Sequence, residues 1–336
     1  MGYVSYVKLV IIRIVRLGNI SMQDQYGREI EYLRVSVTDQ CNLRCQYCMP
    51  QEEGCKKKEE LLTAEEIVRA VDAAAALGIR KVRITGGEPL VRKDLLSICQ
   101  QISERKEIQE LCLTTNATLL EESAQALRKA GVQRVNISMD TLKEDRYEKI
   151  TGKKIQNNAM RGLQAALQAG FQKVKINTVL LGGWNEDEVE AIARMTQSAP
   201  VDVRFIEWMP MYEGKCLEHT TWISCEKVLE ALPEAVFVGQ EGVARLYQLP
   251  GAKGKIGLIS PISHQFCSTC NRLRLTADGT LKPCLHSAQE ISIKGLEKEA
   301  MIQKFREAIL AKPLQHPELS KEQISQAGRN MNQIGG

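Results

Sequence analysis

The sequence has few aromatic residues, little net charge and no long uninterrupted apolar run. Aromatic side chains make up 5% of the 336 residues and the formal net charge is +4, so neither stacking platforms for single strands nor a nucleic-acid partner is indicated. Lys8, Arg13 and Arg16 interrupt the apolar start of the chain, which therefore resembles neither a signal peptide nor a membrane span. We expect no nucleic-acid or membrane partner. We interpret residues 1–21 as an extension that is poorly ordered or a mis-assigned start, with the folded chain beginning at Met22.

Cysteine, by contrast, is abundant. The chain has eleven cysteines and no secretory signal, and their grouping at metal-ligand spacing indicates the reducing cytoplasm and not a disulfide framework. The first group, Cys41, Cys45 and Cys48, has the spacing CxxxCxxC and offers one ligand fewer than a closed zinc or iron–sulfur site takes. Three thiolates can hold three corners of a four-iron cube and leave the fourth iron open to an exogenous chelator. This group therefore predicts a reactive site.

A second incomplete group lies near the other end of the chain. Cys267, Cys270 and Cys284 form a CxxC followed by a lone cysteine, which suggests a second open cluster. The alternative is a zinc site completed by His264 or His286. The remaining cysteines show no grouping and are interpreted as core or surface thiols: Cys55, Cys99, Cys112, Cys216 and Cys225.

From Leu33 to about Trp208, short apolar strands alternate with helical stretches, a pattern typical of βα units and a parallel sheet. Six strands are expected, at 33–38, 81–85, 110–115, 133–138, 172–179 and 201–207. Six units fall short of an eight-stranded barrel, so we expect an α/β fold with a partial (β/α)6 TIM-like barrel. An open doubly wound sheet is the alternative. Capping boxes predict helices at 63–77 and 185–196, from Thr63 with Glu66 and from Asn185 with Glu188.

Several of these strands alternate apolar and polar residues. Arg34, for example, lies between Leu33 and Val35. In a barrel the polar face points inward, so we expect the lumen to hold a charged ligand; the alternative is a polar face that meets solvent. The loop TGGEPL at 85–90 follows the second strand, at the end where α/β enzymes bind ligands, and its paired glycines allow a close approach of the backbone.

The chain after the last βα unit has shorter β-like pieces, at 235–238, 245–249 and 255–259, and a helix near 296–310. We therefore expect a barrel domain over 22–225 and a smaller C-terminal domain over 226–336 that carries the second cysteine group and caps the barrel mouth.

Two features of this C-terminal part are candidates for function. Arg272 and Arg274 lie two and four residues after Cys270, so their side chains point the same way if the segment is extended. The guanidinium group of arginine can bind phosphate through two parallel hydrogen bonds. A solvated edge is the alternative. The terminal Gly335 and Gly336 are either a frayed end or a segment without side chains that enters a crowded site.

Together these residues resemble the radical S-adenosylmethionine (SAM) superfamily and, within it, the molybdenum cofactor biosynthesis protein A family, the GTP 3′,8-cyclases. The resemblance runs from Met22 to the final GG, through CNLRCQYCMP, RITGGEPLVR, LTTNA, NISMD and CSTCNRLRLTADGTLKPC. CxxxCxxC alone identifies the superfamily; the second cysteine group, RLR and the terminal GG narrow it to the family. Ala117 in LTTNA departs from the glycine that the family often has there.

The resemblance implies a lyase that converts GTP to (8S)-3′,8-cyclo-7,8-dihydroguanosine 5′-triphosphate in molybdenum cofactor biosynthesis. It implies two [4Fe–4S] clusters, one on each cysteine group, with SAM as cofactor. Positions that match SAM contacts are Tyr47, Gly87, Ser138 and Met209, and those that match GTP contacts are Arg34, Arg83, Thr114, Lys175, Arg272, Leu273 and Arg274. Beyond the clusters, the catalytic candidates are Arg272, Arg274, Gly335 and Gly336.

The partners implied are GTP, an electron donor such as flavodoxin or ferredoxin, and the next-step cyclic pyranopterin monophosphate synthase. The resemblance leaves a homodimer open and places the protein in the cytoplasm. Two rival functions remain open at this point. One is a radical SAM enzyme that modifies a peptide and carries an auxiliary cluster, and the other is an iron–sulfur carrier without enzymatic activity.

Overall fold

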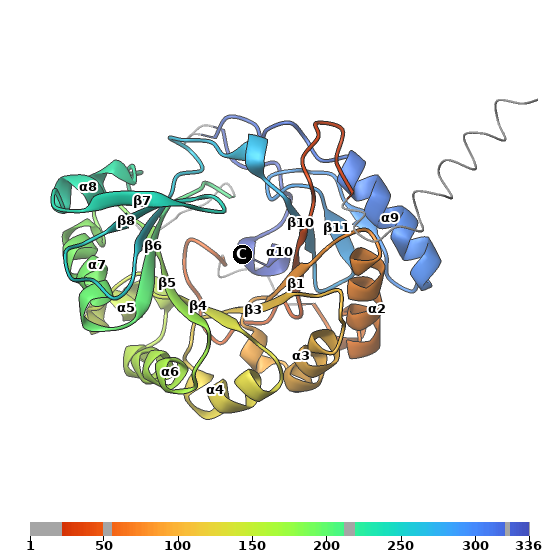
Figure 1. Cartoon of the computed structure of the whole chain (residues 1–336), viewed down its shortest axis with the longest axis horizontal. Coiled ribbons are helices and arrows are strands. Elements are labelled where there is room, and N and C mark those ends of the chain that lie inside the picture. Colours follow the sequence, from red (N-terminus) through yellow and green to blue (C-terminus); the bar gives the residue numbers. More distant parts are fainter. Residues whose placement is uncertain (1–21, 50–55, 212–218, 320–322, 336) are drawn as a thin grey trace, which may run out of the picture.

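The computed structural model describes residues 22–49, 56–211, 219–319 and 323–335; the N-terminal extension, Cys55, Cys216 and Gly336 lie outside these ranges. A single curved sheet runs through the described residues, with the strand order β12-β11-β10-β1-β2-β3-β4-β5-β6-β9-β8-β7. Figure 1 shows this sheet curled around a central space, with helices along its outside.

The six expected βα units form the middle of the sheet. Their parallel strands are β1 (Tyr32–Ser36), β2 (Lys81–Thr85), β3 (Glu110–Thr115), β4 (Arg134–Ser138), β5 (Lys173–Leu180) and β6 (Val201–Glu207). The helices between them are α2 (Ala64–Ala75), α3 (Leu95–Ser103), α4 (Leu120–Lys129), α5 (Glu144–Thr151), α6 (Gln156–Gln168) and α7 (Val189–Ser198). Because these helices cover the outer face only (Figure 1), the partial barrel is confirmed over the doubly wound alternative, which has helices on both faces.

One of the two predicted capping boxes is confirmed. The Thr63 side chain accepts from the Glu66 backbone N–H and the Glu66 carboxylate accepts from the Thr63 N–H, so α2 begins where expected. The second prediction is wrong, because α7 begins only at Val189, after a short 3-10 turn. The Asn185 side chain instead donates to the Asp140 carbonyl at 2.8 Å, and Glu188 accepts from the Thr141 hydroxyl at 2.6 Å. Tertiary partners therefore outcompete the local cap.

The strand faces divide as the alternation predicts. Leu33, Val82 and Val135 are fully buried in the apolar core together with residues of the outer helices. Because successive side chains of a strand point to opposite faces, the residues between them line the inner face. The backbone register aligns Arg34 with Arg83 across β1 and β2. The barrel therefore has a polar lumen.

The C-terminal part extends the sheet at both of its edges. Its strands are β7 (Val236–Glu241), β8 (Ala244–Gln248), β9 (Ile256–Ile259), β10 (Arg272–Leu275), β11 (Thr280–Lys282) and β12 (Ile291–Ser292). Strand β9 pairs parallel to β6, and β10 pairs parallel to β1. Since both parts share one sheet, the boundary between 225 and 226 stays a prediction.

Three further helices complete the described chain: α8 (Glu226–Ala231), α9 (Lys298–Leu310) and α10 (Met331–Ile334). Figure 1 places α10 and the C-terminus inside the curl of the sheet, whereas α8 and α9 lie on its periphery. No helix in the described ranges is long and apolar enough to cross a membrane.

Candidate active site

The first cysteine group lies in the loop that follows β1. Cys41, Cys45 and Cys48 are free and partly buried, and the Cys48 N–H donates to the Cys45 carbonyl at 2.9 Å, which folds the loop into a turn. Burial raises the pKa of the Cys41 thiol to about 11 and of the Cys48 thiol to about 12. Burial and then the charge of Cys48 raise the pKa of Cys45. Three such thiols become thiolates together only when a bound cation stabilises them.

The glycine pair after β2 packs against this loop through the backbone. The Gly87 N–H donates to the Thr38 carbonyl at 2.7 Å, and the next N–H, of Glu88, donates to the Gln40 carbonyl at 2.7 Å. A Cβ atom on Gly87 would lie 2.3 Å from the Gln40 carbonyl oxygen. Only glycine therefore allows the two loops this approach.

The Glu88 carboxylate connects the glycine loop to the loop that follows β3 by hydrogen bonds. It is fully buried and accepts from the Thr115 hydroxyl at 2.7 Å and from the Asn116 N–H at 2.7 Å, at the end of β3. Burial raises its pKa to about 7. The loops after β1, β2 and β3 thus form one hydrogen-bonded unit around the first cysteine group.

The other SAM candidates lie at the same end of the barrel. Tyr47 donates its hydroxyl to Asp140 at 2.6 Å, just beyond β4. Ser138 is the last residue of β4, and Met209 follows β6. Met209 packs against a small apolar cluster of Met211, Ala327 and Ile334, the last of which belongs to α10. The structure brings these side chains to the carboxyl ends of the strands, and their role in SAM binding stays a prediction.

The second cysteine group lies at the start of β10 and after β11. The Arg28 guanidinium donates to the Cys267 carbonyl at 2.7 Å, and the Lys312 ammonium donates to the Arg272 carbonyl at 2.9 Å and the Pro283 carbonyl at 3.0 Å. Burial raises the pKa of Cys270, but Arg272 and Lys312 outweigh it and lower that pKa to about 7. This electropositive setting favours a metal-binding thiolate.

Neither cysteine group is arranged for a single metal ion. No set of three or more His, Cys, Asp or Glu side chains within the described ranges could hold one. The zinc alternative is therefore not supported: His286 Nδ1 lies 3.0 Å from the Ser325 hydroxyl, and His264 Nε2 lies 3.4 Å from Glu226. A four-iron cluster can take three cysteine thiolates and leave its fourth iron open, and three is the number of cysteines in each group.

Guanidinium groups line the lumen between the two cysteine groups. The register places Arg274 opposite Arg34, and Arg34 opposite Arg83, across β10, β1 and β2. Burial lowers the pKa of Arg34 to about 10 and, together with the charge of Arg34, lowers that of Arg274 to about 9. Arg83 also contacts the Thr114 hydroxyl at 3.4 Å. A row of like charges in which Arg83 and Arg274 are buried and Arg34 is partly buried suits a polyanion.

Two other residues that match GTP contacts, Lys175 and Leu273, lie outside this row of arginines. Lys175 lies further around the lumen on β5 and is 3% exposed. Leu273 lies in register with Leu33, on the face that packs under the helices. Its side chain therefore does not face the lumen, which leaves only its backbone for contact with a ligand.

The two cysteine groups lie at opposite ends of the lumen. Strands β1 and β10 are parallel, with Tyr32 opposite Arg272. The first group follows the carboxyl end of β1, whereas Cys267 and Cys270 precede the amino end of β10. A strand of this length spans roughly 16 Å at ~3.3 Å per residue. The cationic row therefore lies between the two groups.

The C-terminal tail enters this space. The Gly335 carbonyl accepts from Arg274 at 2.7 Å and from Arg34 at 3.4 Å. Gly335 has a φ of 80°, and a Cβ atom on it would lie 2.4 Å from the Thr85 hydroxyl. The described tail is thus an inserted segment and not a frayed end, and a glycine is needed at its narrowest point.

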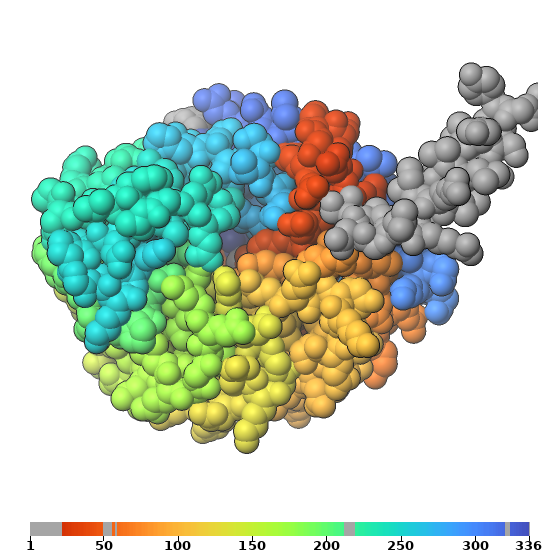
Figure 2. Space-filling view, viewed as in Figure 1, coloured from red at the N-terminus to blue at the C-terminus, as the bar shows by residue number. Residues whose placement is uncertain are grey.

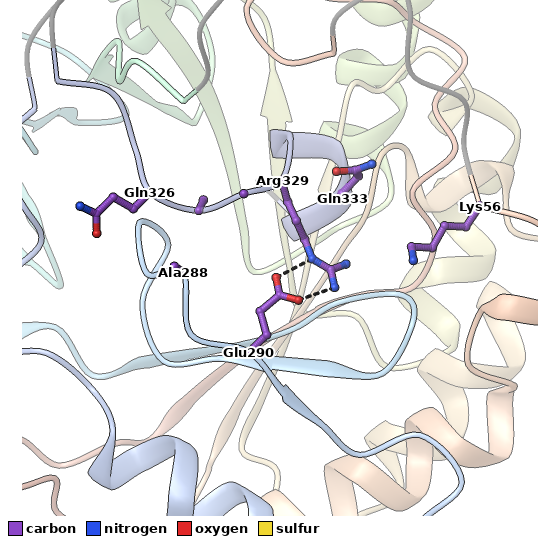
Figure 3. Close-up of a pocket in the computed structure, with 8 residues that line it drawn as sticks. Lys56, Ala288, Glu290, Gln326, Arg329 and Gln333 are labelled. Atoms are coloured by element: carbon purple, nitrogen blue, oxygen red, sulfur yellow. Dashed lines mark hydrogen bonds and ion pairs between the residues drawn. The ribbon is translucent and has the colours of Figure 1, made fainter.

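An ion-pair network anchors the tail before it enters the lumen. The Arg329 guanidinium contacts both carboxylate oxygens of Glu290, at 2.6 and 2.7 Å, and Asp278 at 2.9 Å. Asp278 also pairs with Lys56 at 2.9 Å. Figure 3 shows the bidentate contact between Arg329 and Glu290, with Lys56 on the other side of the pocket that these side chains line.

Several residues of this site escape detection from the sequence. Arg28 and Lys312 act on backbone carbonyls of distant segments, which leaves no local signal. Arg134 and Arg204, by contrast, share the polar face of their strands, and both contact Glu241 at 3.1 and 3.0 Å. Their alternation with apolar neighbours is the signal that could have identified them.

The sequence of this chain is similar to two known protein families and to relatives of known activity. The chain matches the radical SAM superfamily over residues 35–196 and the Molybdenum Cofactor Synthesis C family over residues 201–318. It is 44% identical over 320 residues to a GTP 3′,8-cyclase of Clostridium botulinum (strain Hall) and 46% identical over 321 residues to one of Alkaliphilus oremlandii. Each alignment covers 94% of this chain and the full length of the relative.

Solved structures show a similar fold. Streptococcus suis SuiB superposes with a TM-score of 0.61 at 14% identity, over 93% of this chain and 77% of SuiB. The protein anSMEcpe with bound AdoMet superposes with a TM-score of 0.57 at 18% identity, over 82% of each chain. At these identities the likeness concerns the fold alone.

The Gly87→Ala substitution tests the contact between the glycine loop and the first cysteine group. The added methyl group would clash with the Gln40 carbonyl and push the loops apart. Since losing support behind metal ligands typically lowers metal affinity roughly 10- to 100-fold, we expect anaerobically reconstituted G87A protein to retain less iron. Gly170→Ala is the control, because no atom lies within 4 Å of its Cβ position; its φ of 72°, which Gly87 does not share, adds backbone strain without any clash. Wild-type iron content in G87A would contradict this reading.

The Arg329→Ala substitution tests the tail anchor. We expect it to lower the free energy of unfolding by about 1–2 kcal/mol, since it removes charge-assisted hydrogen bonds, and to accelerate amide exchange in residues 325–335. Arg194→Ala is the matched control, because Arg194 on the outer helix α7 also pairs with two carboxylates, Glu190 of that helix and Glu234 in the turn after α8. Equal exchange of the tail in the wild type and R329A would show that the network does not hold it.

Proposed function

Because this chain belongs to the GTP 3′,8-cyclase family of the radical SAM superfamily, we propose that it converts GTP to (8S)-3′,8-cyclo-7,8-dihydroguanosine 5′-triphosphate in molybdenum cofactor biosynthesis. Its cofactors are SAM and two [4Fe–4S] clusters. The observation that carries the proposal is the row of Arg274, Arg34 and Arg83 between two incomplete cysteine groups. A polyanionic substrate placed there lies between both clusters.

The residues at the carboxyl ends of the strands would hold the first cluster and SAM. Cys41, Cys45 and Cys48 would hold the first cluster through three thiolates, one fewer than the four ligands that a closed cluster takes. When bound, the reduced cluster supplies the electron that cleaves SAM to methionine and a 5′-deoxyadenosyl radical. Tyr47 and Gly87 belong to loops that pack closely at this end, and we assign them to SAM together with Ser138 and Met209. The packed loops keep water away from the radical.

The lumen residues would position GTP. Arg34, Arg83 and Lys175 present cations to the triphosphate, and Thr114 adds a hydroxyl beside Arg83. The product requires loss of the ribose 3′ hydrogen and a new bond between C3′ and C8 of guanine, so these atoms must be held roughly 3–3.5 Å from their reaction partners. Fixing both ends of the nucleotide achieves this.

The second cysteine group would hold the guanine end. Cys267, Cys270 and Cys284 would hold the second cluster, and Arg272 and Arg274 follow Cys270 on β10. The Gly335 carbonyl accepts a hydrogen bond from Arg274, so the tail lies next to the arginines of β10. We assign Arg272, Arg274 and the glycine tail to the reacting nucleotide, with any contact from Leu273 made through its backbone.

The remaining partners follow from this chemistry. A low-potential donor such as flavodoxin or ferredoxin would reduce the first cluster, and cyclic pyranopterin monophosphate synthase would consume the product. Oxygen-sensitive clusters and free cysteines fit the cytoplasm.

The two rival functions, a peptide-modifying radical SAM enzyme and an iron–sulfur carrier, explain fewer features of this site. SuiB, which has also been solved with the precursor peptide SuiA, shares the fold at 16% identity, but a peptide does not require a row of buried guanidinium groups. An iron–sulfur carrier requires neither the glycine loop nor the inserted tail.

The direct test is anaerobic incubation of reconstituted protein with SAM, GTP and a reductant. We expect 5′-deoxyadenosine to form in a GTP-dependent manner, together with the cyclic product detected by mass spectrometry. Formation of 5′-deoxyadenosine that is independent of GTP, or stimulated by a peptide instead, contradicts the proposal.

The double substitution Arg272→Ala and Arg274→Ala should abolish GTP turnover and leave slow, uncoupled SAM cleavage, because the first cluster and its loops are untouched. The matched control is R161A/R194A, which removes two exposed outer arginines that pair with Glu121 and Glu190. Normal GTP turnover in the lumen variant would remove Arg272 and Arg274 from the site.

A further inference from the structure

The hairpin formed by β7 and β8 brings a carboxylate to the lumen from the far edge of the sheet. Glu241 ends β7 and faces Ala244 across a turn that contains Gly242. In the sheet order, β8 and β9 separate β7 from β6. Figure 1 shows the tip of this hairpin pointing toward the centre of the barrel. In Figure 2 its teal surface reaches the middle of the visible face and meets surface coloured yellow and light green.

The Glu241 carboxylate lies among three cations from neighbouring strands. Lys175 on β5 donates to both of its oxygens at 2.8 Å. Arg134 on β4 contacts it at 3.1 Å, and Arg204 on β6 contacts it at 3.0 Å. Glu241 is itself only half-buried. The tip of one hairpin therefore supplies the carboxylate that all three cations share, and Arg134 also pairs with Glu110 of β3 at 3.3 Å.

Even with the charge of Asp202 nearby, this cluster has more hydrogen-bond donors than its carboxylates satisfy. The buried Nε groups of Arg134 and Arg204 have no hydrogen-bond partner within the described part of the chain. Burial, and then the charge of Arg204, lower the pKa of Lys175 to about 8. Burial raises the pKa of Glu241, but its cationic partners outweigh this and lower that pKa to about 2. The cluster can thus accept a ligand with more than one negative charge.

We infer that Glu241 is an internal counter-ion that competes with the substrate's phosphate groups for Arg134, Lys175 and Arg204. This inference rests on the proposed function, in which Lys175 binds GTP. Binding of the triphosphate displaces the carboxylate, and the hairpin tip moves away from the three cations.

This competition makes Glu241 a specificity-determining residue. A ligand that displaces Glu241 gains binding free energy only when it carries more negative charge than the Glu241 carboxylate. A triphosphate does so, whereas a nucleoside brings no charge and a monophosphate brings little more than Glu241. The carboxylate therefore lowers the affinity for all anions but penalises weakly charged ones most. It also keeps the cations paired when no substrate is bound.

The Glu241→Gln variant tests this inference with inorganic triphosphate as the probe. Isothermal titration of the full-length, anaerobically reconstituted protein should show roughly tenfold tighter binding in E241Q, about the effect of one charge-assisted hydrogen bond. The ratio of the affinity for triphosphate to the affinity for monophosphate should be smaller in E241Q than in the wild type. Glu226→Gln is the matched control, because Glu226 pairs with Arg245 of the same hairpin and not with the lumen cations.

A second measurement uses the wild-type chain and does not depend on the variant's folding. Inorganic triphosphate should accelerate amide exchange in residues 236–248 and leave the β11–β12 pair unchanged. Unchanged or weaker triphosphate binding in E241Q contradicts the inference, as does slower exchange in the hairpin. If the wild type binds triphosphate in this way but does not cyclise GTP, the proposed function fails while the role of Glu241 stands.

Discussion

Buried positive charge along the barrel lumen is the constraint on which the rest of the structure depends. Arg274, Arg34 and Arg83 lie side by side on three adjacent strands, which are about 4.8 Å apart. Like charges at this spacing repel, and burial removes the water that would otherwise screen them. Such a row persists only where acceptors from the protein or a ligand lie against it. The Gly335 carbonyl is one acceptor that the chain supplies itself.

The C-terminal part of the chain follows from the same constraint. Strand β10 brings Arg272 and Arg274 to the edge of β1, and the tail places the Gly335 carbonyl on that row. The ion pairs of Arg329 hold the tail in register from outside the lumen. At the opposite edge, β9 pairs with β6 and carries the hairpin that ends in Glu241. Both edges of the six-stranded core thus receive an element that completes the lumen.

Strand alternation allowed the inner face to be predicted from the sequence. The placements of Arg34 and Arg83 follow from a period of two residues, and the start of α2 follows from the local pair Thr63 and Glu66. The pairing of β10 with β1 joins residues about 240 positions apart and has no local signature. For the same reason, the capping box predicted at Asn185 lost to distant partners, because the Asn185 amide donates to the Asp140 carbonyl and Glu188 accepts from Thr141.

The central claim is that two incomplete cysteine groups each hold a four-iron cluster at opposite ends of the cationic lumen. Iron and acid-labile sulfide quantitation of the anaerobically purified protein, with Mössbauer spectra, tests this most directly. The account predicts about eight iron atoms per chain, and about four after Cys267, Cys270 and Cys284 are replaced by alanine. About four iron atoms in the wild type, or one zinc ion on the second group, would contradict it.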